Sequence, residues 1–510
     1  MGIVYLVGAG PGHPGLITVR GMQCLAAADV VLYDHQVHPR LLRHARSDAE
    51  RIDVGVKAPR PFEQEAICYL LAEKAREGKV VTRLKWGDPF MFDHGGSEAL
   101  FLHEQGVAFE VVPGIPAALG AATYAGVPLT YPGGGDTLTF VRIGEDEGKR
   151  RSAPDWKRLA GLDGTIVFYV AFGQVAAVVS ALLAHGRSAE EPSALILDGT
   201  LPTQVATRGS LGDICALAGP SDGDRRTAIL IAGRVAALGE HLRWFDSRPL
   251  FGKRILVTRP REQAAELVGL LESLGADPIE APMIRILPPA DFGPLDDLCA
   301  HVTELDWLVF SSANAVDAFM GRLLASSLDL RSLGSVRICA VGPSTGGRLE
   351  RYGVKADLLP AESRAEEVVA AMLAGGKIEG QRIGLPRSEI GREVIGEELR
   401  KKRALVSEVV AYRTVPVELG TDGEPDVYRM LLERRIDVVT FTSPSAVANL
   451  VKGLGAEPAA DLLKTTLVAS IGPVTADAAA RYGVATTIMP AQYTVPALVD
   501  AIVTYYERRS

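Results

Sequence analysis

The sequence has 510 residues, of which 47% are hydrophobic and 23% are charged, and its formal net charge is −8. At roughly 150 residues per domain this length requires several domains, and the acidic balance argues against the basic surface that nucleic-acid binding needs. No apolar run reaches the roughly 18 residues of a membrane span. The five cysteines form no CxxC pair and the nine histidines no HExxH pattern. We therefore expect a cytoplasmic protein with free thiols, no metal site, and neither nucleic acid nor membrane as a partner.

Short apolar runs of strand character alternate with amphipathic stretches along the whole chain, which is typical of α/β folds. In chain order, the expected strands include residues 2–7, 28–34, 80–82, 165–169, 228–232 and 255–258. A helix-like run is followed by residues 244–252, and a new strand start, basic and then apolar, begins at Lys253. We place the main domain boundary there, at about residue 250.

Glycine and proline gather where the expected strands of the first half end. Residues 8–12 read Gly-Ala-Gly-Pro-Gly, and glycines there let the backbone turn tightly and approach a ligand closely. The run does not complete GxGxxG, which argues against a dinucleotide loop. Residues 83–90, 111–115 and 124–130 also place Gly and Pro near strand ends, where α/β folds gather their active-site loops. Asp34 closes the second strand, either as a functional carboxylate or as a helix cap.

The order and spacing of these runs resemble the tetrapyrrole methylase family, most closely its uroporphyrinogen-III C-methyltransferases, over residues 1 to about 245. The resemblance implies a two-lobed α/β module that forms a homodimer and binds S-adenosylmethionine in the cleft between its lobes. The family's proposed base, which takes the proton released after methyl transfer, corresponds to Asp34. Its cofactor contacts correspond to Pro11, Gly87, Asp88, Pro89, Phe92, Ala117 and Gly199.

The first half departs from the family pattern at several positions. Residues that differ from the usual type are His13, His35, Val56, Trp86, His94, Tyr131, Pro132 and Val170. Lys57, which corresponds to a proposed proton donor of the family, is displaced by one position. Several of these positions line the tetrapyrrole side in the family. The departures therefore affect the expected substrate or rate more than the reaction class.

The second half contains an internal duplication. Residues 310–316, 341–345, 352–354, 257–259 and 285–288 recur as 441–447, 471–475, 482–484, 385–387 and 413–416, respectively. The five offsets lie between 128 and 131 residues, which indicates two similar α/β units. This period is too long for a solenoid. Paired domains of this kind face a shared cleft, where ligands bind.

This half resembles uroporphyrinogen-III synthase across about residues 253–510. The resemblance implies two α/β lobes without a cofactor, one formed by about residues 253–284 and 417–510 and the other by about 285–416. Tyr412 corresponds to the residue most often proposed to assist loss of the substrate's hydroxyl group. The further expected substrate contacts are Arg259, Ser312, Thr345, Arg387, Ser443 and Thr475. The serines can instead be helix caps, and arginines at strand ends are often only solvated.

The two resemblances name consecutive steps of one pathway. They predict a bifunctional enzyme that cyclises hydroxymethylbilane to uroporphyrinogen III and methylates it twice to precorrin-2, for siroheme or cobalamin. Residues 1–245 would be the methyltransferase, 246–252 a linker and 253–510 the synthase. One alternative is a methylase half that is weakened, retuned to another tetrapyrrole, or a dimerising scaffold. A non-enzymatic binding protein or sensor is a second alternative, and the absence of an export signal or a basic helix argues against it.

Overall fold

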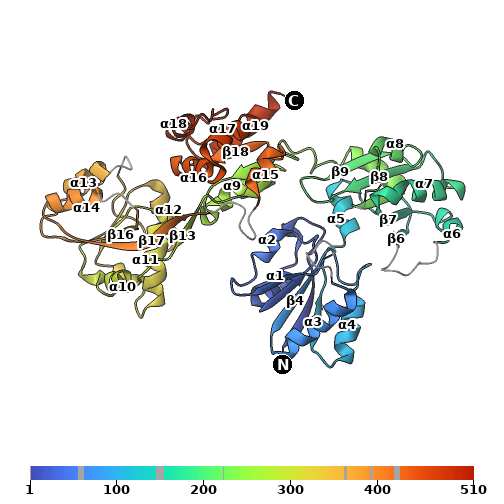
Figure 1. Cartoon of the computed structure of the whole chain (residues 1–510), viewed down its shortest axis with the longest axis horizontal. Coiled ribbons are helices and arrows are strands. Elements are labelled where there is room, and N and C mark those ends of the chain that lie inside the picture. The colour runs from blue at the N-terminus through green and yellow to red at the C-terminus, as the bar shows by residue number, and fades with distance from the viewer. Residues whose placement is uncertain are drawn as a thin grey trace. The chain divides into compact units, whose positions relative to one another are not determined.

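The computed structural model describes residues 2–55, 62–144, 154–221, 223–224, 226–360, 365–390, 394–417 and 425–509. Val56 and Lys57 lie outside the described residues. The chain divides into two compact units, of which the first is Met1–Lys253 with Leu271–Asp277 and the second is Arg254–Leu270 with Pro278–Ser510. Four sheets with intervening helices form the two units (Figure 1). The expected α/β class is confirmed.

The first sheet is parallel throughout, in the order β3-β2-β4-β1-β5. Its strands are β1 (Ile3–Gly8), β2 (Val30–Tyr33), β3 (Glu50–Asp53), β4 (Val80–Lys85) and β5 (Phe109–Val112). The helices that connect them are η1 (Pro14–Leu16), α1 (Val19–Ala27), α2 (Pro39–Leu42), α3 (Gln64–Arg76) and α4 (Gly95–Glu104). Because all strands run in the same direction, the loops after β1, β2 and β4 meet at one edge of the sheet.

The second sheet of the first unit has the order β6-β7-β10-β8-β9 and is mixed, because only β6 and β7 pair in parallel. Its strands are β6 (Leu138–Arg142), β7 (Thr165–Ala171), β8 (Pro192–Leu197), β9 (Val205–Ser210) and β10 (Thr227–Ala232). The associated helices are α5 (Ala117–Tyr124), α6 (Trp156–Ala160), η2 (Phe172–Gln174), α7 (Val175–Ala184), α8 (Ile214–Ala218) and η3 (Arg234–Glu240).

One sheet of the second unit has the order β12-β11-β18-β19 and joins strands that are far apart in sequence. Its strands are β11 (Arg254–Val257), β12 (Asp277–Glu280), β18 (Val438–Phe441) and β19 (Leu467–Ser470). Its helices are α9 (Arg261–Ser273), α15 (Val427–Leu432), α16 (Pro444–Leu454), α17 (Ala456–Leu463), α18 (Pro473–Ala480) and α19 (Val495–Glu507).

The other sheet of the second unit has the order β13-β17-β16-β14-β15, with only β13 antiparallel to its neighbour. Its strands are β13 (Ile284–Leu287), β14 (Trp307–Phe310), β15 (Arg337–Ala340), β16 (Arg382–Ser388) and β17 (Leu405–Pro416). Its helices are α10 (Gly293–Ala300), η4 (Val302–Glu304), α11 (Ala313–Ala325), η5 (Leu330–Leu333), α12 (Pro343–Arg351), α13 (Ala365–Ala374) and α14 (Val394–Lys401).

The predicted duplication of the second unit is confirmed by the backbone. Ser312 precedes α11 with φ −158° and ψ 158°, and Ser443 precedes α16 with φ −159° and ψ 154°. Gly342 and Gly472 likewise precede α12 and α18 in extended conformations, each followed by a proline in the first helical position. Equivalent sequences therefore form equivalent strand-to-helix turns in both lobes.

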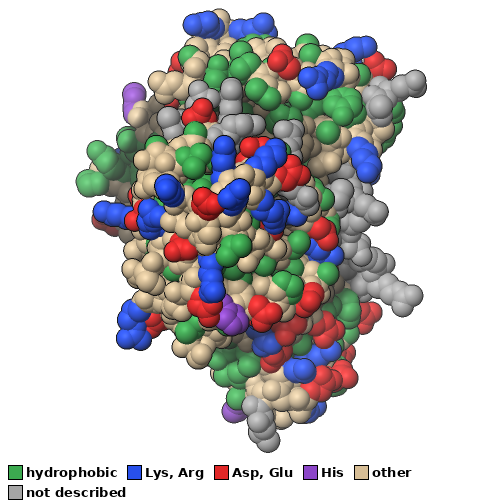
Figure 2. Space-filling model, turned by 90° about the vertical axis from the view of Figure 1, so that its left-hand side faces the viewer, with side chains coloured by type: hydrophobic (Ala, Val, Ile, Leu, Met, Phe, Trp, Pro, Cys, Tyr) green, Lys and Arg blue, Asp and Glu red, His purple; other side chains and the backbone are tan. Residues whose placement is uncertain are grey.

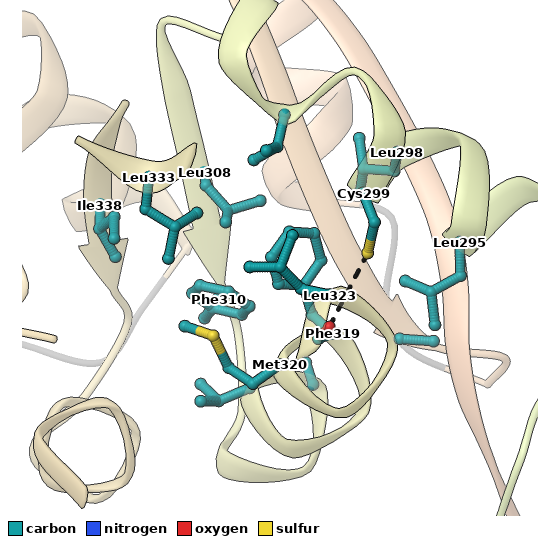
Figure 3. Close-up of a cluster of buried hydrophobic side chains, with 14 of the residues drawn as sticks. Leu295, Leu298, Cys299, Leu308, Phe310, Phe319, Met320, Leu323, Leu333 and Ile338 are labelled. Atoms are coloured by element: carbon teal, nitrogen blue, oxygen red, sulfur yellow. Dashed lines mark hydrogen bonds between the residues drawn. The ribbon is translucent and has the colours of Figure 1, made fainter. Parts of the chain in front are cut away.

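A buried apolar cluster fixes α11 on its sheet (Figure 3). Phe310 of β14 and Phe319 of α11 are fully buried and pack edge to face, with ring centroids 5.6 Å apart. The Cys299 thiol donates to the carbonyl of Phe319 over 3.8 Å, and all five cysteines are free thiols. Because each buried side chain of this size contributes about 1.5–3 kcal/mol, the cluster holds the start of α11 in a defined place.

Charges of both signs are interspersed on the one face of the molecule that Figure 2 draws. Lys and Arg side chains lie there among Asp and Glu side chains. Within the described ranges, no helix combines the length and the apolar character that crossing a membrane would require.

Candidate active sites

The loops after β1 and β4 meet in the first unit. The N–H of Gly87 donates to the carbonyl of Gly10 at 2.8 Å, and the N–H of Gly10 donates to that of Gly87 at 3.2 Å. Their φ angles are 72° and 80°, which residues with side chains rarely adopt. Pro11 follows directly. The predicted cofactor residues Pro11 and Gly87 therefore lie on adjoining loops at one edge of the sheet.

Asp88 fixes the backbone of the second loop. Its Oδ1 accepts the N–H of Phe90 at 2.9 Å, and its Oδ2 accepts the N–H of Gly114 at 3.0 Å. The carbonyl of Pro89 lies against Gly95, where an added Cβ would approach it to 2.2 Å. The predicted cofactor residues Asp88 and Pro89 thus give the loop its shape and tie it to the start of α4.

Phe92 lies beside Tyr169 of β7, which also contacts α5. The two rings pack edge to face at 5.2 Å, and the Tyr169 hydroxyl accepts the N–H of Ala118 at 3.1 Å. Phe92 has a φ of 56°, and its carbonyl accepts a hydrogen bond from Arg142 at 2.8 Å. These contacts hold the strained backbone of Phe92 close to the start of α5, where Ala117 lies.

Small residues let α5 approach the surrounding loops closely. A Cβ added to Gly120 would come within 2.4 Å of the ring of Pro11, and one added to Gly199 within 2.5 Å of an α5 side chain. A Cβ on Gly87 would lie 3.5 Å from the amide nitrogen of Ala117. The structure therefore brings the seven predicted cofactor residues into one cradle around α5. The glycines and Ala117 place few side-chain atoms there, which suits a ligand that is contacted mainly by the backbone.

Asp34 follows β2, and both of its carboxylate oxygens are occupied. Arg83 donates to Oδ1 at 2.5 Å, and the backbone N–H of Trp86 donates to Oδ2 at 3.1 Å. Burial is the largest influence and raises the pKa of Asp34, but Arg83, Lys85 and these hydrogen bonds together hold it below its ordinary value. Asp34 is therefore ionised at neutral pH. It is not a helix cap, because His38 caps the helix that follows.

A cluster of buried charged side chains adjoins Asp34 and is connected to it through Arg83. The side chains of Arg83, Lys85 and Glu98 are at most 3% exposed. Glu98 accepts from Lys85 at 3.0 Å and from Arg83 at 3.3 Å, and Lys85 also lies 3.2 Å from Asp93. Charges tolerate such burial only when they are paired. Among the described residues, the cluster joins two cations to three carboxylates, including that of Asp34.

The sequence analysis assigned no role to Arg83, Lys85, Asp93 or Glu98. The sequence did contain a signal for this cluster. Arg83 and Lys85 directly follow the apolar start of an expected strand, and a charge in a buried strand needs a partner of opposite charge. The acidic partners come from α4 and the loop before it, so only the fold identifies them. Burial and then the charge of Asp34 raise the pKa of Asp93, although Lys85 opposes this.

Two departures from the family pattern have a visible structural effect. His13 is the N-cap of η1, where its Nδ1 accepts the N–H of Gly15 at 3.0 Å, as an Asp oxygen would. The Trp86 indole N–H donates to the carbonyl of Pro11 at 3.2 Å. Several of the departures were expected to alter the tetrapyrrole side, whereas the Trp86 indole contacts the predicted cofactor loop.

In the second unit, Tyr412 of β17 meets Ser312 at the start of α11. Their hydroxyl oxygens are 3.1 Å apart, and Tyr412 is only 8% exposed. The Ser312 oxygen also accepts the N–H of Ala315 at 3.2 Å. Ser312 is therefore a helix cap, as the alternative proposed, and at the same time a partner of the predicted catalytic tyrosine.

Ser443 and the two predicted threonines occupy repeat-equivalent positions. Ser443 caps α16 by accepting the N–H of Ala446 at 3.2 Å, and its oxygen lies 3.0 Å from that of Ser445. Thr345 and Thr475 lie in the first turns of α12 and α18 and are 5% and 3% exposed. Capping thus accounts for both serines, and the threonines line the equivalent turns.

The two predicted substrate arginines differ in their surroundings. Arg387 donates to Glu408 at 2.8 Å, so its charge is already paired within the protein. Arg259 donates to the side-chain oxygen of Gln263 at 3.4 Å, and burial lowers its pKa more than nearby Glu266 raises it. In the part of the chain that the structure describes, no carboxylate forms an ion pair with Arg259. Arg259 is therefore the better placed of the two to meet an acidic substrate.

Comparison with known proteins matches both halves. The family model of tetrapyrrole (corrin/porphyrin) methylases matches residues 3–215, and that of uroporphyrinogen-III synthase HemD matches residues 265–500. A porphyrin biosynthesis protein HemD of Ruminiclostridium josui is 33% identical over 98% of this chain and 97% of its own length. The chain belongs to the family of tetrapyrrole methylase–uroporphyrinogen-III synthase fusions. It is a bifunctional enzyme of tetrapyrrole biosynthesis, with methyltransferase and synthase domains.

Two further relatives match a smaller part of the fusion enzyme. A uroporphyrinogen-III C-methyltransferase of Bacillus subtilis is 33% identical over 72% of this chain and 76% of its own length. A siroheme synthase of Tolumonas auensis is 42% identical over 50% of this chain and 54% of its own length.

Proposed function

We propose that the second unit cyclises hydroxymethylbilane to uroporphyrinogen III with inversion of the last pyrrole ring. The first unit then methylates this product twice with S-adenosylmethionine to give precorrin-2, a precursor for siroheme or cobalamin. The observation that carries the proposal is that one chain assembles two sites. One is the glycine-rich cradle beside the ionised Asp34, and the other is the buried pair of Tyr412 and Ser312.

In the second unit, Tyr412 donates its phenol proton to the terminal hydroxyl of hydroxymethylbilane. The C–O bond breaks with both electrons going to oxygen, water leaves, and the neighbouring pyrrole nitrogen supplies the electron pair of a cationic azafulvene. Attack by the substituted carbon of the last ring gives a spiro intermediate, which fragments and recloses with that ring inverted. The proton released from the pyrrole carbon on closure restores the phenol, so that water is the only by-product.

The second unit must also hold a flexible substrate with eight carboxylates in one conformation. Arg259 forms no ion pair with any residue that the structure describes, and the equivalent turns of the two lobes offer backbone N–H groups. The residues proposed to contact substrate are Arg259, Ser312, Thr345, Arg387, Ser443 and Thr475. Of these, Arg387 must exchange or share its partner Glu408 to do so.

In the first unit, the cradle around α5 is the proposed site of S-adenosylmethionine, because the glycine-rich loops after β1 and β4 meet there through backbone hydrogen bonds at positive φ angles. The residues proposed to hold it are Pro11, Gly87, Asp88, Pro89, Phe92, Ala117 and Gly199. When bound, it would supply a methyl group on a positively charged sulfur. Asp34 then takes the proton that the methylated macrocycle loses, and Arg83 stabilises the carboxylate before that step.

The proposed organisation follows the sequence analysis: methyltransferase in residues 1–245, a linker in 246–252 and synthase in 253–510. The synthase lobes are about residues 253–284 with 417–510, and about 285–416. The fusion pairs as a homodimer through its methylase half.

The contact between Trp86 and Pro11 supports a second candidate function. An indole that touches the cofactor loop, at a position where the family has glycine, would change the space available to the macrocycle. The first unit would then methylate another tetrapyrrole or act mainly as a scaffold, while the synthase activity is unchanged.

Product analysis of the full chain with hydroxymethylbilane tests both candidates. Without S-adenosylmethionine we expect uroporphyrinogen III, and with it the dimethylated precorrin-2, separated by chromatography and identified by mass. Formation of only the symmetric type I isomer, which arises spontaneously, would contradict the synthase assignment. Type III product that is never methylated would favour the second candidate.

A further inference from the structure

The hydrogen bond between Ser312 and Tyr412 does more than a helix cap requires. A cap needs only the N–H of Ala315, which the Ser312 oxygen accepts at 3.2 Å. The same oxygen lies 3.1 Å from the phenol oxygen of Tyr412, on a different element of the same lobe. Ser312 therefore links the first turn of α11 to the side chain proposed to lose a proton.

Either hydroxyl can be the donor in this hydrogen bond, and the cap favours Ser312 as the donor. One lone pair of the Ser312 oxygen is used by the N–H of Ala315, and a hydroxyl that accepts a hydrogen bond becomes a better donor. The chain of hydrogen bonds then runs from Ala315 through Ser312 to the oxygen of Tyr412. A tyrosine that accepts in this way keeps its own O–H free to point toward another acceptor.

We propose that Ser312 is a positioning residue that orients the phenol of Tyr412, so that its proton faces the departing hydroxyl of the substrate. This inference rests on the proposed role of Tyr412 in the synthase reaction. This role replaces the substrate contact considered above for Ser312: the serine holds the donor direction of Tyr412 and forms no bond to substrate.

The internal repeat helps to separate two roles of Ser312, which are capping the helix and positioning Tyr412. Ser443 has the same backbone angles as Ser312 to within 4° and caps its helix at the same 3.2 Å distance. By the repeat offset of 128, however, the residue equivalent to Tyr412 is Ile284, which has no hydroxyl and lies in β13 on the sheet of β17. Ser443 contacts Ser445 instead. Capping thus accounts for the serine in both lobes, and only one lobe adds a phenol.

Steady-state kinetics of the full chain test the proposal, with the type III fraction of the product measured beside the rate. We expect Ser312→Ala to lower kcat about tenfold, which is less than the roughly 10²–10⁴-fold loss of a general acid that is removed altogether, because Tyr412 is still present. KM should stay within about twofold. In a Tyr412→Phe background, Ser312→Ala should cause no further loss, because there is no phenol left to orient. Ser312→Thr, which keeps the hydroxyl, should retain most of the rate.

Ser443→Ala is the matched control, because it removes an equivalent cap. Both alanine variants should lower the unfolding temperature by similar amounts, which separates loss of stability from loss of rate. The effects of Ser443→Ala and Tyr412→Phe on kcat should multiply, as for independent sites. If those of Ser312→Ala and Tyr412→Phe multiply as well, the positioning role is wrong. If Tyr412→Phe alone leaves kcat unchanged, the proposed role of Tyr412 fails, and the inference fails with it.

Discussion

Asp34 shows how the surroundings of one residue define its chemistry. Its two oxygens are held by Arg83 and by the backbone of Trp86, and the net effect of its surroundings is a lowered pKa. A lowered pKa keeps the carboxylate ionised and able to accept a proton, although it weakens it as a base. The hydrogen bonds also fix the direction in which the carboxylate can act.

We predict that Asp34→Asn lowers methylation turnover by about 10²–10⁴-fold, the usual range for loss of a general base. Asn keeps the shape and one acceptor but cannot take the proton at neutral pH. The affinity for S-adenosylmethionine, measured by calorimetry, should stay nearly unchanged, because the cradle residues are not altered. Asp53→Asn, at the end of the neighbouring strand β3, is the control and should leave turnover unchanged. Normal turnover in Asp34→Asn would remove Asp34 from the mechanism.

At the scale of elements, the buried charges connect strand β4 to helix α4. Arg83 and Lys85 point from β4 toward Glu98, which is fully buried in α4. Burial raises the pKa of Glu98, but Arg83 and Lys85 outweigh this and lower it below its ordinary 4.5. Removing one partner of such a pair leaves uncompensated charge in the interior, which is far more costly than losing a surface pair.

Glu98→Gln should therefore lower the free energy of unfolding of the first unit by about 3–5 kcal/mol at pH 7, measured by urea unfolding. Because the pKa of Glu98 is lower in the folded state, its contribution is present above the unfolded pKa and is lost as pH falls through the folded value. The variant should accordingly lose less stability than the parent as the pH falls below the ordinary value of 4.5. Glu110→Gln removes an exposed pair with Arg20 and serves as the control. Equal effects of both variants would show that burial of the cluster contributes nothing.

At the scale of the whole molecule, two compact units of nearly equal size correspond to the methyltransferase and the synthase domains. Two apolar clusters of the second unit consist only of residues of that unit. One contains Phe310 and Phe319, and the other, in the second lobe, contains Phe441. A domain that buries its own core can fold by itself.

Residues 253–510, expressed alone, should therefore convert hydroxymethylbilane to the type III isomer without added metal or cofactor. The measurement is the ratio of type III to type I product, with the full chain assayed in parallel. If the fragment folds, as judged by circular dichroism, but gives only type I isomer, the synthase site requires residues of the first half.

Much of the fold followed from sequence, because local patterns determine local structure. Apolar runs ending in Gly and Pro gave the strands and their loops, and the repeat offsets near 130 residues predicted two equivalent lobes. The strand-to-helix turns at Ser312 and Ser443 confirm this, since equal sequences adopt equal backbone angles. The resemblance to a methylase and a synthase was likewise contained in motif order and spacing.

The partners of individual side chains were decided only by the tertiary structure. Sequence proposed Ser312 as a substrate contact or a cap, but its bond to Tyr412 joins residues 100 positions apart. The sequence likewise identified Asp34 as a candidate base but not its partner Arg83, nor the Glu98 that pairs with Arg83. It identified Arg387 but not its partner Glu408. Hydrogen bonds and ion pairs act over about 3 Å, so they depend on how distant elements are packed. Periodicity determines which face a residue occupies, and packing alone determines which group it meets there.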